Sequence, residues 1–305
     1  MPENKLKNYL QLHFIVFIWG FTAILGALIS IDAIPLVWFR MLLAVLFIGV
    51  YFLFKKKQIK VDNKTLLKFL FSGVIIALHW ITFFKAIKVS NVSIALVTMS
   101  TGAFFTSLIE PIFFRRRIRS IELLLGLIVI GGLYVIFNFE TQYYLGIIYA
   151  LVSAFLVAFF SVLNGLYVKK NEPSVISFYQ LLFGVLFVTI YLGYKGSFTI
   201  EFFRLPINDW FYLLVLSSIC TAYAFIVSVK IMKHISPYTV MLTINLEPVY
   251  AIILALIIFG DKEKMNPEFY LGALIVLGVV LLNGILKSRN VLKLKSNREK
   301  SKTNT

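Results

Sequence analysis

The sequence predicts an all-α integral membrane protein with ten transmembrane helices in two inverted five-helix repeats. Three observations support this fold class: long apolar stretches recur, lysine and arginine gather in alternate connections, and the second half repeats the spacing of the first. The 305 residues are 60% hydrophobic and only 14% charged, with a mean hydropathy of +0.89. Ordinary soluble domains are about 25% charged, so this chain lacks the polar residues that a soluble surface needs.

Apolar stretches of about 20 residues, the length that crosses a bilayer as a helix, divide the chain into ten predicted spans. Few stretches alternate with period two, which argues against a transmembrane barrel. The predicted spans are residues 8–29, 34–54, 65–87, 91–113, 119–138, 143–168, 174–193, 208–231, 237–259 and 266–286. The connections are short, and no extramembrane domain fits between the spans.

Basic residues set the predicted orientation through the positive-inside rule. With the N-terminus in the cytoplasm, 23 lysines and arginines lie on the inner side, 6 lie on the outer side, and Arg40 lies within a span. An even number of spans then places both termini in the cytoplasm of a multi-pass protein of the cell (inner) membrane. The net charge of +16 is spread over these clusters, so it does not predict nucleic-acid binding.

The chain also repeats internally. A shift of 146 residues brings these positions into register: Ser90 with Ser236, Phe113 with Phe259, Glu122 with Glu268, Gly126 with Gly272, and Gly132 with Gly278. The second and seventh spans match less well at a shift of 140, where Arg40 meets Gln180. We therefore predict a first repeat at residues 1–139, a second at 140–287, and a basic cytoplasmic tail at 288–305 that is disordered. Five helices is an odd number, so the second repeat enters the membrane inverted, which is typical of transporters.

Glu247 is the most unusual polar residue in the predicted spans. It lies near the middle of its helix, and a charge at the bilayer centre costs at least about 3 kcal/mol on insertion scales. Pro248 removes a backbone N–H and loosens the helix, and Asn245 adds a polar amide nearby. The carboxyl is either protonated or paired across the bundle. Two interpretations stay open: a hydrogen-bonded packing residue, or a site for a solute or a proton.

Arg40 lies roughly 9 Å inside the outer end of the second span, at about 1.5 Å per residue. A guanidinium stays protonated and forms forked bonds to carboxylates. Arg40 could bind an anionic solute, pair with Glu247, or extend to the outer surface. By contrast, Lys85 and Glu110 lie near span ends, where we expect them to reach the interface.

Other candidates are polar or aromatic residues within the predicted spans. They are Trp19, His79, Trp80, Asn164, Tyr179, Gln180 and Tyr223. Each one alone is equally consistent with packing. Together they predict a cavity whose lining is mixed rather than strongly charged.

No residue cluster predicts an enzyme. The three histidines (His13, His79 and His234) are far apart in the sequence, and Cys220 is the single cysteine. This pattern predicts no metal site, no cofactor and no catalytic triad, and the sequence has no GxxxxGK[ST] phosphate-binding loop. The expected partners are a small-molecule solute and the lipid bilayer, with no nucleic acid. The oligomeric state stays open, and a monomer is compatible with the sequence.

Several motifs resemble the EamA-type members of the drug/metabolite transporter superfamily. They are FIWGF, PLVWFRMLLA, the serines that precede the fourth and ninth spans, and LEPVYAIILALIIFGDK followed by LGALIVLGVVLL. The resemblance covers residues 10–286 and implies a ten-helix bundle that exports or exchanges small organic solutes. Trp19, Arg40 and Glu247–Pro248 match family positions. Gly102 stands where the family often has a helix-breaking proline, so it is the matching candidate for a break or gate.

We therefore predict a secondary transporter, an exporter or exchanger of small organic metabolites such as amino acids. Alternating access would occur around a cavity at the membrane midplane, and proton coupling through Glu247 is a hypothesis. The alternatives are a channel and a non-transporting scaffold or sensor. The residues expected to bind the solute or couple transport are Glu247, Arg40, Trp19, His79, Trp80, Tyr179, Gln180, Asn245 and Tyr223, with Pro248 and Gly102 at helix breaks.

Overall fold

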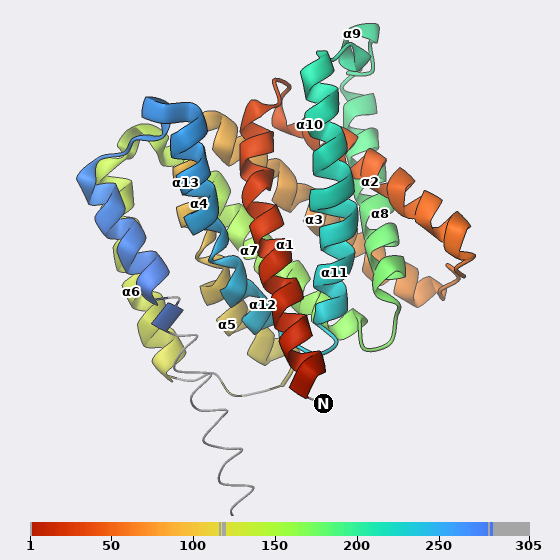
Figure 1. The fold of residues 1–305 in the computed structure, drawn as a ribbon, viewed down its shortest axis with the longest axis horizontal. Coiled ribbons are helices and arrows are strands. Elements are labelled where there is room, and N and C mark those ends of the chain that lie inside the picture. The colour runs from red at the N-terminus through yellow and green to blue at the C-terminus, as the bar shows by residue number, and fades with distance from the viewer. Residues whose placement is uncertain (1, 116, 118–119, 280, 283–305) are drawn as a thin grey trace, which may run out of the picture.

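The computed structural model describes residues 2–115, 117, 120–279 and 281–282, and this part of the chain is built from helices (Figure 1). Eight described helices are long and apolar enough to cross a membrane. Two shorter apolar helices, Leu124–Ile136 and Pro267–Val279, lie where the sequence predicts the fifth and tenth spans. The tail at 288–305 lies outside the described residues.

The helices follow the predicted order. Their bounds are α1 Pro2–Leu28, α2 Ala33–Lys55, α3 Asn63–Val89, α4 Val92–Met99, α5 Gly102–Phe113, α6 Ser120–Phe139, α7 Tyr144–Tyr167, α8 Pro173–Tyr194, α9 Ile200–Phe203, α10 Ile207–Ser217, α11 Ala224–Ile231, α12 Pro237–Ile244 and α13 Glu247–Phe259. Short helical turns η1 (Thr141–Tyr143) and η3 (Gly260–Glu263) and a π-helical segment η2 (Ser218–Tyr223) complete the labelled elements.

Three stretches that the sequence predicts as single helices are interrupted. The fourth span divides into α4 and α5, the ninth divides into α12 and α13, and the eighth contains the π segment η2 between α10 and α11. At the first break, the hydroxyls of Ser100 and Thr101 bond back to backbone carbonyls and compete with the regular helical ladder. At the second break, Pro248 has no N–H group to donate to the carbonyl one turn earlier, so the helical ladder cannot run unbroken from α12 into α13.

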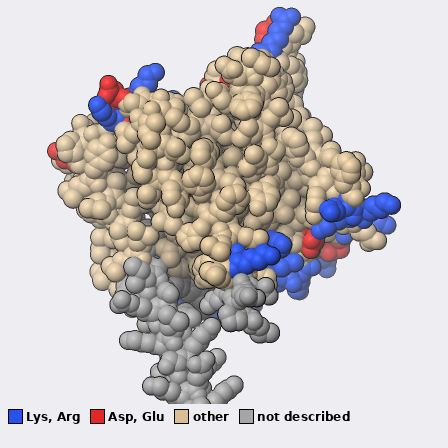
Figure 2. Space-filling view, viewed as in Figure 1, with Lys and Arg blue, Asp and Glu red and all other residues tan. Residues whose placement is uncertain are grey.

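The centre of the molecule is a tightly packed group of helices in which α3 lies against α7 and α8. Gly73 makes the contact between α3 and α8 possible, because a Cβ there would lie 2.4 Å from the carbonyl oxygen of Gln180. On one flank, α6 lies beside the helix Pro267–Val279 (Figure 1), and the two backbones approach where Gly132 meets Gly272. Large apolar side chains cover most of the surface, and in Figure 2 the charged residues gather at two opposite rims.

Two of the interrupted spans, the fourth (α4 and α5) and the ninth (α12 and α13), are linked by carboxylates at both rims and are called the two broken helices below. Helix α4 contacts α13, and α5 contacts α12. Beyond α13, Glu263 accepts hydrogen bonds from the backbone N–H groups of Val92 and Ser93 at 3.0 and 2.9 Å, at the start of α4. Near the end of α5, Glu110 accepts one from the N–H of Tyr238 at 2.9 Å, at the start of α12.

Glu110 therefore does not extend to the interface as its position in the sequence predicts. Glu110 is 5% exposed. It accepts from the N–H group of Tyr238, which lies in the first turn of α12 and has no acceptor within that helix. A carboxylate at a helix N-terminus is also favoured by the helix dipole. Each broken helix thus holds the first turn of the other, at opposite faces of the protein.

We predict that Glu263→Gln lowers the melting temperature of the detergent-solubilised protein. The amide keeps one acceptor, but its NH₂ group faces a backbone N–H, and a hydrogen bond to a charged group is worth about 1.5–3 kcal/mol. Asp261→Asn in the same turn is the control. Asp261 is exposed and pairs only with Lys264 among the described residues. The melting temperature of the Asp261→Asn protein should therefore match that of the wild type. Equal melting of all three proteins would refute the assignment of Glu263 as a structural cap.

Candidate functional site

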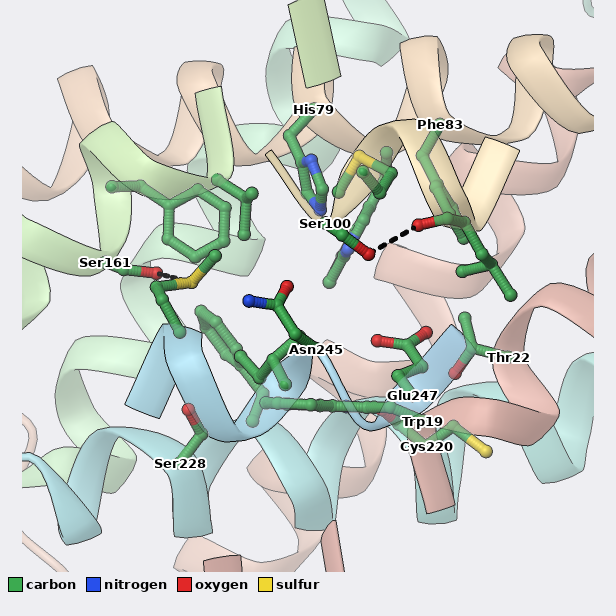
Figure 3. A pocket seen from close by; sticks show the side chains of 18 of the residues that line it. Trp19, Thr22, His79, Phe83, Ser100, Ser161, Cys220, Ser228, Asn245 and Glu247 are labelled. Atoms are coloured by element: carbon green, nitrogen blue, oxygen red, sulfur yellow. Dashed lines mark hydrogen bonds between the residues drawn. The ribbon is translucent and has the colours of Figure 1, made fainter. Parts of the chain in front are cut away.

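One cavity lies between α1, α2, α3 and α7 and the three interrupted helices. The volume open to the centre of a water molecule is about 90 Å³, which is room for several waters at about 10–15 Å³ each. The cavity extends to Asn164 and Met232, near the ends of α7 and α11 on the side where α1 begins. Figure 3 shows Asn245 and Glu247 between the group of His79 and Ser100 and the group of Trp19 and Cys220.

Arg40 is the cation of the cavity wall. Its side chain is 2% exposed, its Nε donates to Thr221 Oγ1 at 2.7 Å, and its guanidinium lies 3.9 Å above the centre of the Trp80 ring. The ring face carries partial negative charge, so this contact stabilises the cation without neutralising it. The Nη1 atom is buried and has no hydrogen-bond partner among the described residues. Arg40 is therefore held in place but keeps one donor unused.

The π segment holds both Arg40 and Trp19. Thr221 accepts the bond from Arg40 and donates its hydroxyl to the carbonyl of Leu216 at 2.7 Å. The carbonyl of Cys220 accepts from the indole N–H of Trp19 at 3.1 Å. A π turn widens the helix and is common at functional sites. Here it brings two acceptors to residues of the first and second helices.

Glu247 stands at the first residue of α13, directly after the helix break. Its carboxylate points into the cavity beside Thr22 (Figure 3). Glu247 and Arg40 line the same cavity but form no ion pair with each other. Each therefore remains free to bind a group of opposite charge or polarity that enters the cavity.

His79 contributes an acceptor to the lining. Its Nδ1 lies 3.1 Å from the carbonyl oxygen of Ser153 and 2.8 Å from the Ser153 hydroxyl. A carbonyl oxygen only accepts, so Nδ1 carries the proton, and in the neutral ring Nε2 is left as an acceptor. The Ser153 hydroxyl in turn donates to the His79 backbone carbonyl at 2.9 Å. This double contact fixes the orientation of the ring.

The cavity brings together most of the residues that the sequence singles out. Trp19, Arg40, His79, Trp80, Asn164, Asn245, Glu247 and Pro248 all line it. Gln180 lies behind the wall, where its Nε2 donates to Asn164 Oδ1 at 2.6 Å. Gly102 is the first residue of α5 and packs against Met241, which lines the cavity.

Two candidates lie elsewhere. Tyr179 stacks on Phe69, and its hydroxyl donates to the carbonyl of Ile59 at 3.0 Å, in the connection between α2 and α3. Tyr223 is 46% exposed at the end of η2. Neither tyrosine lines the cavity.

Sequence reasoning missed the residues that support Arg40 and His79. Thr221 and Ser153 are single hydroxyl groups in apolar helices, and such residues commonly bond to their own helix. The stretch SSICT at 217–221 carries a signal in retrospect, because four of its five side chains are polar or polarizable. Its π geometry is not visible from those residue types.

The polar groups of the wall favour a solute with both hydrogen-bond acceptors and donors. Arg40 Nη1, Asn164 Nδ2 and Asn245 Nδ2 are buried donors without a partner among the described residues. Unpaired buried donors cost about 1–3 kcal/mol each, so ligand oxygens are a natural complement. Glu247 supplies acceptors for a donor or cationic group. Among the described residues, no cluster of His, Cys, Asp or Glu could hold a metal ion.

A multi-pass helical protein with a polar cavity between interrupted helices is the architecture of a membrane transporter. The chain belongs to the EamA-like transporter family, whose model matches residues 7–138 and 144–285. Membership makes the chain a transporter rather than an enzyme.

Relatives agree with this classification. The uncharacterized transporter YxxF of Bacillus subtilis (strain 168) is 23% identical over 288 residues, which cover 92% of this chain and 88% of the relative. An uncharacterized transporter of Clostridium kluyveri is 23% identical over 216 residues, 68% of each chain. A crystal structure shares the fold with a TM-score of 0.68 at 13% identity, over 92% of this chain and 98% of that one.

We predict that Thr221→Val lowers the melting temperature of the protein. The substitution keeps the shape but leaves Arg40 Nε without its partner in a buried site, at a cost of about 1–3 kcal/mol. Thr82→Val is the matched control, because the Thr82 hydroxyl bonds only to carbonyls of its own helix among the described residues. A similar loss in both variants would show that the bond from Arg40 to the π segment contributes nothing specific.

Proposed function

We propose that this transporter is a secondary carrier that exports or exchanges small organic metabolites, such as amino acids, by alternating access. The observation that carries the proposal is the cavity in which Arg40 and Glu247 face the same space without pairing. One cation and one carboxyl group together suit a solute that carries both charges or none. Five aromatic rings in the wall (Trp19, Trp80, Phe83, Phe160 and Phe225) provide apolar contact for the rest of the solute.

The proposed architecture is ten spans in two inverted repeats, residues 1–139 and 140–287. The interrupted fourth and ninth spans support it, because they occupy matching places in the two halves and both contact the cavity. Short half-helices of this kind can tilt about their breaks, which would open the cavity to one face and then to the other. The sequence has no ATP-binding loop, so a solute or ion gradient would drive transport.

Glu247 is the proposed proton carrier. Intramembrane carboxyl groups serve as proton relays in many pumps and transporters. Glu247 has the required position, at a helix break and in contact with the cavity. A proton and a donor group of the solute would occupy the carboxyl group in turn, which would couple their movements in opposite directions.

We predict that Glu247→Gln abolishes transport driven by a pH gradient in proteoliposomes. The amide keeps the size of the side chain but cannot exchange a proton. Counterflow of a panel of labelled amino acids and related metabolites identifies a transported compound, and uptake with and without a pH gradient is then compared. Glu201→Gln, on the exposed helix α9, is the control and should behave as the wild type.

The outcomes separate the alternatives. Saturable uptake that survives Glu247→Gln under a pH gradient would keep the carrier and assign Glu247 to packing. Rapid flux without saturation would indicate a channel. Absence of flux for every compound would favour a scaffold or sensor.

The proposed orientation has both termini in the cytoplasm of the cell membrane. We predict that a cysteine at exposed Lys195 reacts with an impermeant maleimide on intact cells, while one at exposed Lys60 reacts only after the membrane is broken. The background is Cys220→Ala, which removes the single native thiol. The reverse labelling pattern would invert the topology.

A further inference from the structure

Arg40 and Gln180 occupy equivalent places in the two halves of the chain. Each is the eighth residue of its helix, α2 or α8. Arg40 Nε donates to a hydroxyl in the other half, Thr221 Oγ1, at 2.7 Å. Gln180 Nε2 also donates to a hydroxyl in the other half, Ser72 Oγ, at 2.8 Å. The chain runs in opposite directions in α2 and α8, so the two residues lie toward opposite faces of the membrane.

Arg40 and Gln180 differ in their access to the cavity. Arg40 lines the cavity itself, whereas Gln180 reaches it through Asn164. Gln180 Nε2 donates to Asn164 Oδ1 at 2.6 Å, which requires that oxygen to face Gln180. The NH₂ group of Asn164 must then point the other way. The bond from Gln180 therefore occupies the Asn164 oxygen and leaves the Asn164 NH₂ group available to a ligand.

The Asn164 amide nitrogen is an unused donor in the cavity wall. The residue is 1% exposed, and Nδ2 has no hydrogen-bond partner among the described residues. A buried donor without a partner is unfavourable unless something else satisfies it. Asn164 lies near the last turn of α7, at the end of the cavity toward the side where α1 begins.

We propose that Asn164 forms a second solute-binding subsite, for an oxygen acceptor such as the carboxylate of the solute, and that Gln180 and Ser72 are its positioning residues. This inference rests on the proposed carrier function. Arg40 would bind the same acceptor group when it lies deeper in the cavity. A hydrogen bond from a charged donor is roughly twice as strong as one from a neutral donor. The solute is therefore held more weakly at Asn164, the neutral end, and leaves or enters there more easily.

The test measures half-saturation separately at the two faces of the protein in oriented proteoliposomes, with the panel of labelled amino acids as probes. Asn164→Leu removes the donor, and its half-saturation constant at the face where α1 begins should rise about fivefold, the equivalent of one lost hydrogen bond. The constant at the opposite face should stay unchanged. Ser174→Ala is the control, because Ser174 is buried on α8 but does not line the cavity.

Gln180→Met tests the positioning role. It keeps the length of the side chain but loses both donated bonds, so it should raise the same constant by a similar factor. The double variant should be no worse than either single variant, because both remove one interaction. Additive losses, or a lower maximal rate with unchanged half-saturation, would reduce Gln180 to a packing residue and overturn its positioning role.

The experiment distinguishes a wrong subsite proposal from a wrong carrier proposal. If the wild type transports a probe and Asn164→Leu leaves both half-saturation constants unchanged, the subsite is refuted and the carrier stands. If the wild type transports no probe, both proposals fail together.

Cysteine labelling tests the placement of the subsite without a transported solute. In a Cys220→Ala background, Asn164→Cys should react with a small impermeant methanethiosulfonate added at the face where α1 begins, and Ser174→Cys should not. Equal reactivity, or reaction from the opposite face alone, would overturn the placement of the subsite.

Discussion

The cost of placing a polar group inside a bilayer is the constraint on which this structure depends. Backbone N–H and C=O groups have no water to bond with there, so each helix must satisfy its own ladder or find a partner on another helix. Two of the three interruptions in the described spans have side-chain partners for their backbone carbonyls. The hydroxyls of Ser100 and Thr101 bond to local carbonyls at one break. At the π segment, the side chains of Trp19 and Thr221 bond to the backbone carbonyls of Cys220 and Leu216.

The same constraint explains the two carboxylates at the rims. A helix that begins near the membrane surface leaves N–H groups unpaired in its first turn. Glu263 and Glu110 each bond to such groups on the other broken helix. The two helices run in opposite directions, so one bond set lies at each face of the membrane. The pair is thereby held at both ends while its middle, at the cavity, remains broken.

The two charged residues of the cavity meet the same constraint, because each has a local feature that stabilises its charge. Arg40 is stabilised by an aromatic ring and a hydroxyl rather than by a carboxylate. Glu247 is placed at a helix start, where the dipole favours negative charge. Neither residue needs the other as a partner, and both can exchange polar contacts with a solute. The neutral groups of Asn164 and Asn245 extend this polar surface with donors whose desolvation is less costly than that of a charge.

The sequence by itself determined the helical membrane class, the order of the spans, and the charged, amide and histidine residues of the cavity lining. These features follow from hydropathy and from the rarity of polar residues in lipid, both of which are local properties of the chain. Glu247, Arg40 and His79 stood out for this reason, because each is costly in an apolar helix.

Only the tertiary structure decided which polar residues meet. Tyr179 and Gln180 are neighbours in one helix, yet Gln180 supports the cavity wall and Tyr179 bonds to the α2–α3 connection. Glu110 has the sequence position of an interfacial acid, yet it is buried against the start of α12. Thr221 has no unusual sequence signal, yet it holds Arg40. Sequence spacing fixes the face of a helix on which a residue lies, but helix rotation, the π turn and close glycine contacts such as that at Gly73 fix its partner.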